Sequence, residues 1–338
     1  MKINIYFPMK EGPWGGGNQF LKALKLQLEK MGIYEENPKK SDAIIFNSFE
    51  NSQEVLGLKR DIPKIPFIHR VDGPISLVRG QDKILDRLIF SINHSIADGT
   101  IFQSKWCKDQ SFLLGMKKNK FETIIYNAPD ESIFNEIGKS EFNPTKKIKL
   151  ISVSWSNNWN KGFNFYQFLD KNLDWNRYEM TFIGRSPLKF DNIKMLGILN
   201  SRDIAKQLKQ SDIFITASKD EPCSNALIEA LSCGLPSLAL SSGGSPELIE
   251  MGGELFLKEE EMIDKLDILV KNYSKYKNNL PKFSIEQATQ KYLNFIQLIK
   301  EGLSDGSYSV KRVGLDGFIR SKFIFVLWFI KRILNKLF

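Results

Sequence analysis

Short apolar runs alternate along most of the chain with longer segments in which apolar residues recur at a helical period. The runs predict strands at Ile3–Phe7, Ala43–Phe46, Pro66–Ile68, Thr100–Gln103, Thr123–Tyr126, Lys149–Val153, Met180–Ile183, Asp212–Thr216 and Ser237–Leu240. The periodic segments predict helices at Gln19–Met31, Lys83–Ile96, Lys105–Leu114, Ile204–Gln210, Asn225–Ser232, Glu259–Asn272 and Ile285–Ile299. This alternation indicates an α/β protein with parallel sheets that are covered on both faces.

The alternating pattern starts twice, at Ile3–Phe7 and again at Lys149–Val153, and each start is followed by a polar or glycine-rich turn. Between the two lies Glu141–Lys147, a polar segment with one proline and no apolar period, which is typical of a linker. A chain of 338 residues is also longer than one hydrophobic core usually holds. We therefore expect an N-terminal domain at 1–145, a second domain at 146–302 and a tail at 303–338.

The cysteines and the N-terminus favour a cytoplasmic protein. The three cysteines form no CxxC pair, so neither a disulfide framework nor a structural zinc site is expected. The apolar run Ile3–Phe7 is too short for a signal-peptide core, so nothing in it indicates export.

The positive charge of the chain is concentrated in the tail. Seven basic residues and one acid lie from Lys311 to the end, so the tail carries six of the nine net positive charges. A nucleic-acid-binding protein would carry a basic stripe with interleaved aromatics on its folded body, and none is visible. The charge favours an anionic membrane surface as partner, and excludes nucleic acid from the expected partners.

The segment 317–338 combines this charge with an apolar run, Phe323–Ile330, that has Lys and Arg on both sides. Eight apolar residues cannot cross a bilayer as a helix, because a crossing needs about 20. They can lie in the membrane interface with aromatic side chains buried and basic ones at the headgroups. The alternative is a helix packed on the protein's own surface or at a dimer interface. The concentration of aromatic and basic residues favours a peripheral position on the inner face of the cell membrane.

Two N-terminal segments carry candidate chemistry. The glycine-rich Gly12–Asn18 follows the first strand, where glycines let the backbone approach an anionic ligand and Asn18 is expected to cap the helix; the alternative is an ordinary tight turn. His69, Arg70 and Asp72 follow a predicted strand, at the edge of the sheet where ligands bind in open α/β folds. A lone histidine there is often structural, and His94 is expected on a helix surface.

Two further segments lie in the second half of the chain. Lys161-Gly162 after a strand suits a diphosphate, because the ammonium and the helix-start amides both stabilise anions, although a solvated loop lysine is commoner. Ser218–Pro236 gives the strongest signal: Glu221 lies in the loop after a strand, and Glu229 lies about one turn inside the helix that Ser224 or Asn225 caps. No Asp-x-Asp and no His/Cys cluster occurs, so no metal site is expected.

Taken together, these segments resemble the large family of retaining GT-B glycosyltransferases, whose mark is two glutamates separated by seven residues. The resemblance covers about residues 1–300 and is carried by Glu221 and Glu229, by the sequences at 230–236 and 243–247, and by Ile125–Asp130. It implies a GT-B fold, with two Rossmann-like domains facing across a cleft and a last helix that crosses back. It also implies transfer of a sugar from a nucleotide-sugar donor to a glycan or lipid-linked acceptor, with retention, without a metal and without a cofactor.

The resemblance also assigns roles. As catalytic residues it implies His69 and Glu221 at the donor sugar and Lys161 at the diphosphate, and it makes Glu229 the ribose ligand. The donor-binding residues that follow are Gly16, Gly17, Arg185, Pro222, Cys223, Ser224, Asn225 and Glu229. The family often has an arginine five residues before the lysine, where this chain has Ser156. Arg185 or Arg70 is expected to replace that cation.

Two other functions remain open at this point: a GT-B-fold nucleotide-sugar epimerase and a non-catalytic sugar-nucleotide-binding scaffold subunit. An epimerase needs acid/base groups around the sugar, and a chain with only two histidines offers few of them. The missing arginine favours the scaffold, while the intact glutamate pair weighs against it. The sequence does not identify the nucleotide base, the donor sugar, the acceptor or the linkage.

Overall fold

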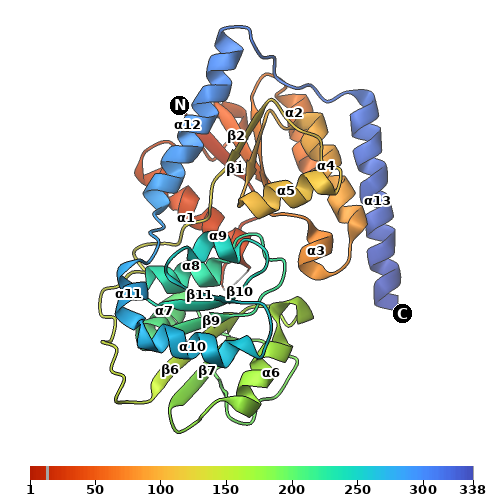
Figure 1. Cartoon of the computed structure of the whole chain (residues 1–338). Helices are drawn as coiled ribbons and strands as arrows, with labels where there is room; N and C mark the ends of the chain where they lie inside the picture. Colours follow the sequence, from red (N-terminus) through yellow and green to blue (C-terminus); the bar gives the residue numbers. More distant parts are fainter. Residues whose placement is uncertain (13–14, 338) are drawn as a thin grey trace. The chain divides into compact units, whose positions relative to one another are not determined.

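The computed structural model describes residues 1–12 and 15–337, with side chains through Leu334 (Figure 1). Pro13 and Trp14 of the first glycine-rich loop and Phe338 of the tail lie outside the described residues. The chain divides into two compact units, each of which gathers segments that are distant in sequence. Unit 1 comprises Met1–Met9, Leu24–Tyr126 and Glu286–Phe338, and unit 2 comprises Lys10–Ala23 and Asn127–Ile285.

The described part of unit 1 contains a parallel sheet in the order β1-β2-β3-β4-β5. The first four strands are almost wholly buried, as expected for a sheet with both faces covered, whereas the edge strand β5 is buried only at its first residue. They are β1 (Ile3–Tyr6), β2 (Ala43–Asn47), β3 (Phe67–Val71), β4 (Gly99–Phe102) and β5 (Phe121–Ile124).

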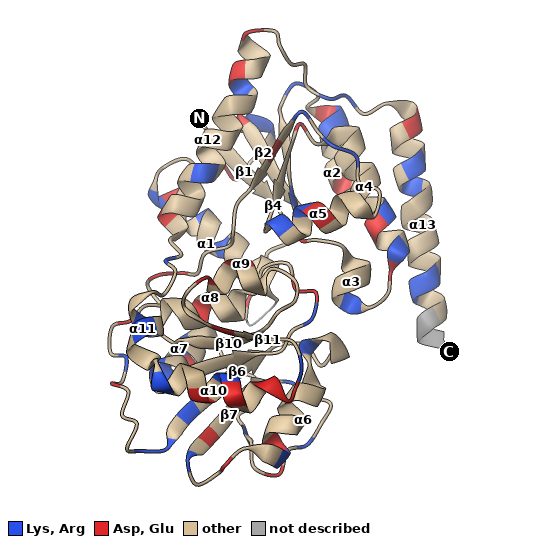
Figure 2. Cartoon of the chain, in the orientation of Figure 1, with Lys and Arg blue, Asp and Glu red and all other residues tan. Residues whose placement is uncertain are grey.

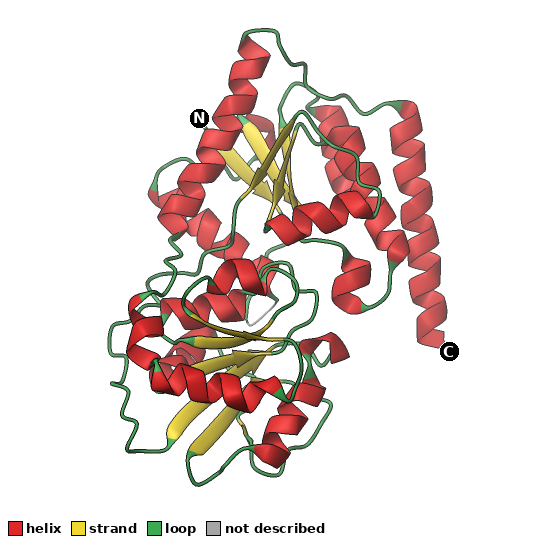
Figure 3. Cartoon of the chain, viewed as in Figure 1, coloured by secondary structure: helices red, strands yellow, loops and turns green. Residues whose placement is uncertain are grey.

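Helices connect these strands and cover the sheet (Figure 3). The described helices of unit 1 are α1 (Gly16–Lys30, of which 16–23 belong to unit 2), η1 (Pro38–Lys40), α2 (Ser52–Asp61), α3 (Ile75–Arg79), α4 (Lys83–Ile96), α5 (Lys105–Leu113), α12 (Ile285–Ser304) and α13 (Leu315–Leu337). α13 lies along α4 (Figure 1) and contributes Phe318, Phe325 and Trp328 to the edge of the unit 1 core.

The described part of unit 2 contains a second parallel sheet, in the order β11-β10-β9-β6-β7-β8. The strands are β6 (Ile148–Ser154), β7 (Tyr178–Gly184), β8 (Lys194–Met195), β9 (Ile213–Thr216), β10 (Ser237–Leu240) and β11 (Gly253–Phe256). After β6 the chain builds outward through β7 and β8, then returns to place β9 on the other side of β6. The strand order therefore reverses between β6 and β9, which is the position where ligands bind in open α/β sheets.

Unit 2 has its own core of aromatic and aliphatic side chains, among them Phe163, Tyr166, Phe182 and Phe256. Its described helices are η2 (Trp159–Lys161), α6 (Phe163–Asn172), α7 (Ser201–Lys209), α8 (Asn225–Ser232), α9 (Ser245–Ile249), α10 (Glu261–Lys271) and α11 (Tyr273–Asn278). Each unit thus buries a complete hydrophobic core, which confirms the two-domain α/β prediction.

Every predicted strand and helix overlaps an observed one, but the boundaries shift and some elements are new. β3 continues to Val71, three residues beyond the predicted end, because both neighbours pair with it: Arg70 lies opposite Asn47 of β2, and Val71 opposite Phe102 of β4. β11 was not predicted, because Gly253 and Glu254 interrupt its apolar run. Its parallel hydrogen bonding with β10 forms the strand despite this weak sequence signal.

The units divide at other residues than the sequence-based domains. The segment after Tyr126 belongs to unit 2, because its residues bond to the end of α7: the Ser140 amide donates to the Lys209 carbonyl at 2.9 Å, and Lys139 Nζ to the Ser211 carbonyl at 2.7 Å. Residues 286–338, which include most of α12, belong to unit 1. The polar linker at 141–147 is therefore part of unit 2.

Candidate active site

The loops after β6 and β9 meet at the reversal in strand order of unit 2. η2, which ends at Lys161, lies in the first loop, and Glu221 lies in the second. The Lys219 amide donates to the Asn160 carbonyl at 2.7 Å, so the two loops are joined through their main chains. Gly162 permits this approach: its φ is +76°, and a Cβ there would collide with the carbonyl oxygen of Ala217 at the end of β9.

Lys161 and Glu221 form an ion pair at this junction. Lys161 Nζ lies 2.8 Å from Glu221 Oε2, and the two side chains are 23% and 21% exposed, so the pair is accessible from solvent. Burial by itself raises the pKa of Glu221, but the charge and hydrogen bond of Lys161, with a hydrogen bond from Ser218, outweigh it and lower the pKa overall. Glu221 is therefore held ionised beside a cation that a bound anion can share.

A second turn holds the main chain of Glu221 in place. The Gly244 amide donates to the Glu221 carbonyl at 2.8 Å. Gly243 has φ of +63°, and a Cβ there would collide with the main chain of Glu221, so only glycine lets the turn approach this closely. This contact explains the need for glycine at position 243.

The loop after Glu221 leads directly into α8. Pro222, Cys223 and Ser224 are buried, and Ser224 caps the helix by accepting from the Leu227 amide at 3.4 Å. Of the two expected caps it is therefore Ser224 that serves. Asn225 instead donates from its side chain to the Gly16 carbonyl at 2.6 Å and accepts from the Asn127 side chain at 2.8 Å. Gly16 and Gly17, at the start of α1, thus lie beside the N-terminus of α8.

Asn18 does not cap α1, contrary to expectation, because the helix already begins at Gly16. Its side chain accepts from the Lys10 amide at 2.8 Å and donates to the Lys10 carbonyl at 3.0 Å. It therefore closes the glycine-rich loop upon itself.

Glu229 lies one turn inside α8 and differs from Glu221 in having no partner among the described residues. Its carboxylate makes no hydrogen bond or ion pair with the residues that the structure describes, although the side chain is partly buried. Loss of solvation raises its pKa to about 8. Because this carboxyl group is poorly solvated and receives no hydrogen bond from the described residues, it is suited to accept hydrogen bonds from the hydroxyls of a ligand.

Arg185 supplies a second cation at the same sheet edge. It follows β7, the neighbour of β6, and its amide donates to the Ser154 carbonyl at 3.0 Å. The exposed guanidinium stacks on the Trp155 ring, 4.9 Å from its centroid. Of the two arginines expected to replace the cation missing at Ser156, Arg185 is the exposed one.

His69 occupies a different environment from the predicted one. It lies inside β3 and is 0% exposed, because the strand is longer than its sequence indicated. One ring nitrogen lies 2.9 Å from the Ser48 carbonyl and the other 3.0 Å from the Asn93 side chain, and the ring stacks on Phe46. Burial lowers its pKa to about 3, so the ring is neutral. In this conformation it has no exposed atom with which to contact a sugar.

Polar side chains at the carboxyl ends of the unit 1 strands bond to one another. Arg70 is buried and pairs with Asp72, which also accepts from the side chains of Asn47 at 2.7 Å and Gln103 at 2.5 Å. Burial and the charge of Asp72 raise the pKa of nearby Glu50 to about 7. Sequence analysis missed Asn47, Glu50 and Gln103; the available signal was that each follows or ends a strand beside the strand of Asp72.

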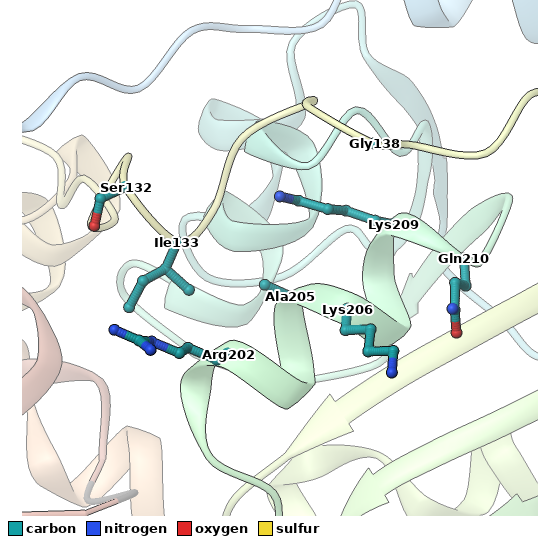
Figure 4. Close-up of a pocket in the computed structure, with 8 residues that line it drawn as sticks. All are labelled: Ser132, Ile133, Gly138, Arg202, Ala205, Lys206, Lys209 and Gln210. Carbon is teal, nitrogen blue, oxygen red and sulfur yellow. The ribbon is translucent and has the colours of Figure 1, made fainter.

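The described residues contain no group of three or more His, Cys, Asp or Glu that could hold a metal. They do include a pocket of about 480 Å³ on α7. Its lining includes Arg202, Lys206 and Lys209, together with Ser132, Ile133 and Gly138 of the segment before β6 (Figure 4). α7 precedes β9, so this pocket is separate from the loops that follow the strands. None of the predicted site residues lines it.

Residues 188–287 match the family model of glycosyl transferases group 1. Among curated proteins, the chain is 29% identical over 224 residues to the "Probable sucrose-phosphate synthase" of Thermosipho melanesiensis (61% of this chain, 51% of the relative). It is 37% identical over 182 residues to a human protein named as a component of phosphatidylinositol N-acetylglucosaminyltransferase (50% of this chain, 36% of the relative). The matched regions thus span about half or less of these relatives.

Among solved structures, the chain is similar to HepE of Anabaena in complex with UDP-glucose, with a TM-score of 0.60 and 16% identity. The match covers 90% of this chain and 99% of HepE. Identity at this level establishes the fold alone. The fold of this chain is therefore GT-B, with a group 1 glycosyltransferase match in its second half.

Proposed function

We propose that this protein is a glycosyltransferase that takes a sugar from a nucleoside diphosphate sugar. One observation carries the proposal. At the strand-order reversal of unit 2, a lysine–glutamate pair lies beside the helix that bears Glu229, whose carboxylate has no partner in the described part of the chain. The match to glycosyl transferases group 1 over residues 188–287 supports it. Uridine diphosphate sugars are the first donors to test, because the structurally similar HepE was solved with UDP-glucose.

Each group of the site has a part in this chemistry. Glu229 accepts hydrogen bonds from the ribose hydroxyls, while Lys161 and Arg185 neutralise the diphosphate. Glu221, with the main chain from Pro222 to Asn225, orients the donor sugar. When the bond between the anomeric carbon and the phosphate oxygen breaks, negative charge grows on the leaving diphosphate, and the two cations stabilise it there.

The proposed reaction proceeds with retention, and it needs neither a metal nor a cofactor. The acceptor hydroxyl forms the new bond to the anomeric carbon on the face that the diphosphate leaves. The acceptor's proton passes to an oxygen of the leaving diphosphate. The donor thus supplies its own base, which suits a site whose nearby carboxylate, Glu221, is already paired with Lys161.

The proposed acceptor is a glycan or a lipid-linked molecule, and the proposed location is the cytoplasm, at the inner face of the cell membrane. The relative that is named for phosphatidylinositol N-acetylglucosaminyltransferase supports a lipid acceptor, since that name specifies one.

The proposed ribose contact is tested by comparing the nucleotide affinities of two proteins. The affinities of the wild type and Glu229→Ala are measured by calorimetry for UDP and for its 2′-deoxy and 3′-deoxy forms. Above pH 8, where the carboxyl of Glu229 is ionised, we expect Glu229→Ala to bind UDP about 10 to 100-fold more weakly, since hydrogen bonds to a charged group contribute about 1.5 to 3 kcal/mol. The deoxy forms should lose affinity for the wild type but little for the variant. Glu286→Ala, an exposed glutamate of α12, is the matched control.

Turnover of a donor panel by NMR completes the test. Release of nucleoside diphosphate that requires Glu229 supports transfer. Interconversion of sugar nucleotides without an acceptor would identify an epimerase instead, and saturable binding without turnover would identify a scaffold. Equal losses of affinity for the deoxy forms in wild type and variant would reject the ribose role of Glu229.

A further inference from the structure

Along its described length, α13 has two apolar faces, and the described residues cover one of them. The inner face packs against unit 1 through Phe318, Ile324, Phe325 and Trp328. Ser321, at the centre of this face, is fully buried and lies 3.0 Å from the hydroxyl of Ser91 on α4. The helix is therefore a packed part of unit 1.

Contacts along its length fix the rotation of α13 about its own axis. The Trp328 ring lies 6.0 Å from that of Phe49, and Lys331 Nζ lies 3.7 Å from a carboxylate oxygen of Asp82. The segment that leads into the helix is anchored as well, because Asp98 accepts from the Tyr308 hydroxyl at 2.9 Å and from the Lys311 amide at 2.7 Å. The opposite face of the helix is consequently held outward.

That outward face is apolar along its described length. At about 100° per residue, its side chains cover one continuous stripe on the side opposite Ser321. Each is at least two-fifths exposed, and Phe323 is 62% exposed. The stripe, which we call the outer face, consists of Ile319, Phe323, Val326, Leu327, Phe329, Ile330, Ile333 and Leu334. An uninterrupted apolar surface of this kind marks an interaction site.

Basic residues recur along α13, as its blue bands in Figure 2 show, and at about 100° per residue Arg320 and Lys322 fall on the two sides of the outer face. Arg320, Lys322 and Arg332 are exposed. The sequence from Gly317 to the C-terminus contains no Asp or Glu. The surface therefore combines exposed apolar side chains with uncompensated positive charge.

We propose that the outer face of α13 binds an anionic phospholipid bilayer, with the helix lying in the plane of the membrane surface. Apolar side chains buried at the acyl boundary and Lys or Arg at the headgroups are the pattern of an interfacial helix. Among the described residues, no helix is long and apolar enough to cross a bilayer. The inference stands on α13 alone and does not rest on the proposed glycosyl transfer.

Charge distinguishes a bilayer from a second copy of this chain. In a two-fold dimer through α13, the same surface would face itself, and the basic residues of one copy would approach those of the other. The segment from Gly317 onward offers no acid to pair with them. An anionic lipid surface complements both the apolar stripe and its basic border.

The test uses the full chain and point variants. Removing α13 would strip the cover from α4, so a deletion could lose binding merely by unfolding. Binding is measured by co-sedimentation with vesicles of phosphatidylcholine, with and without phosphatidylglycerol. We expect the wild type to bind the anionic vesicles and not the neutral ones. Phe323→Gln/Val326→Gln/Ile330→Gln should weaken that binding by on the order of 100-fold, since it removes the apolar contact.

Two further variants test how specific the vesicle binding is. One is a control for the loss of apolar surface elsewhere on the protein, and the other measures the contribution of positive charge. Leu113→Gln/Ile137→Gln/Leu257→Gln replaces apolar residues outside α13 that are even more exposed, and it should leave vesicle binding unchanged. Arg320→Gln/Lys322→Gln/Arg332→Gln should weaken it by on the order of 100-fold at low salt, because each basic residue near an anionic leaflet contributes about fivefold.

The proposal is overturned if the outer-face variant binds anionic vesicles as tightly as the wild type. It is also overturned if the wild type ignores vesicles and forms a dimer that the same variant converts to a monomer. Nucleotide affinity, measured on each preparation, keeps the two proposals apart. A loss of vesicle binding with intact UDP binding bears only on the proposal for α13. A loss of UDP binding with intact vesicle binding bears only on the proposed donor site.

Discussion

The two sheets of this protein both place polar and charged side chains at the carboxyl ends of parallel strands, but they use them differently. In unit 1, Asp72 accepts from Arg70, Asn47 and Gln103, so the protein itself supplies the donors. In unit 2, Lys161 and Glu221 pair while remaining accessible, and Glu229 has no partner among the described residues. A polar group without a protein partner is free to bond to a ligand, so the comparison supports the proposal that the donor binds to unit 2.

The largest effect is expected at Lys161. Lys161→Met removes the cation that we propose to face the leaving diphosphate. It should lower donor turnover by about 100 to 1,000-fold, as loss of one preorganised stabilising group does elsewhere. Lys171→Met, which changes an exposed lysine near the end of α6, should change turnover less than twofold. Single-turnover kinetics on the identified donor make the comparison. Similar losses in both variants would remove the special role of Lys161.

His69 should affect stability and leave donor binding unchanged. His69→Ala leaves a cavity under Phe46 and deprives Asn93 of a partner, so it should lower the free energy of unfolding by about 2 to 4 kcal/mol. Urea denaturation measures this loss, and calorimetry of the folded variant should give wild-type affinity for UDP. A variant that keeps wild-type stability but loses donor affinity or turnover would restore the catalytic role that the sequence predicted for His69.

Nucleotide affinity should depend on pH through Glu229. Desolvation raises its pKa to about 8 from an ordinary value of 4.5, so the free protein carries a neutral carboxyl at pH 7. Ribose hydroxyls bond better to the carboxylate, so UDP binding should tighten by up to about tenfold per pH unit as the pH rises towards 8. Glu229→Gln should remove this dependence. A pH profile shared by both proteins would assign it to another group.

The same pKa shift predicts how stability changes with pH. Between pH 4.5 and 8 the folded protein holds a proton on Glu229 that the unfolded chain has lost. The contribution of Glu229 to stability is therefore fully present below pH 4.5 and is lost as the pH rises through 8. Urea denaturation across this range should show a smaller decline for Glu229→Gln than for the wild type.

Arg185 should give the smallest effect. Because its guanidinium is exposed, water and salt screen its interaction with a diphosphate. Arg185→Ala should weaken UDP binding by about fivefold at low salt and less at high salt. Arg202→Ala, which changes the basic pocket on α7, is the matched control and should have no effect. Unchanged UDP affinity in Arg185→Ala would leave the cation missing at Ser156 without a replacement.

The sequence by itself determined the α/β class, the two parallel sheets and the position of the strongest candidate site. The apolar runs at β6, β9 and β10 are long enough to be recognised as buried strands, and turn residues close each of them. Local spacing alone was enough to place Glu221 in the loop after a strand and Glu229 one turn inside the helix that follows. Each of these features depends on a segment of about ten residues, whose backbone preferences and apolar period determine its local structure.

Only the tertiary structure decided which side chains meet, which are buried and which remain without partners. His69 was expected at a strand end, yet pairing with both neighbouring strands extends β3 and encloses the ring. The contact of Lys161 with Glu221 joins residues 60 positions apart and depends on Gly162 and Gly243 fitting against other segments. The apolar run of α13 predicts burial, but its packing on α4 decides which face is covered and which faces outward. Burial and electrostatic environment depend on neighbours brought together by folding, and local sequence does not specify those neighbours.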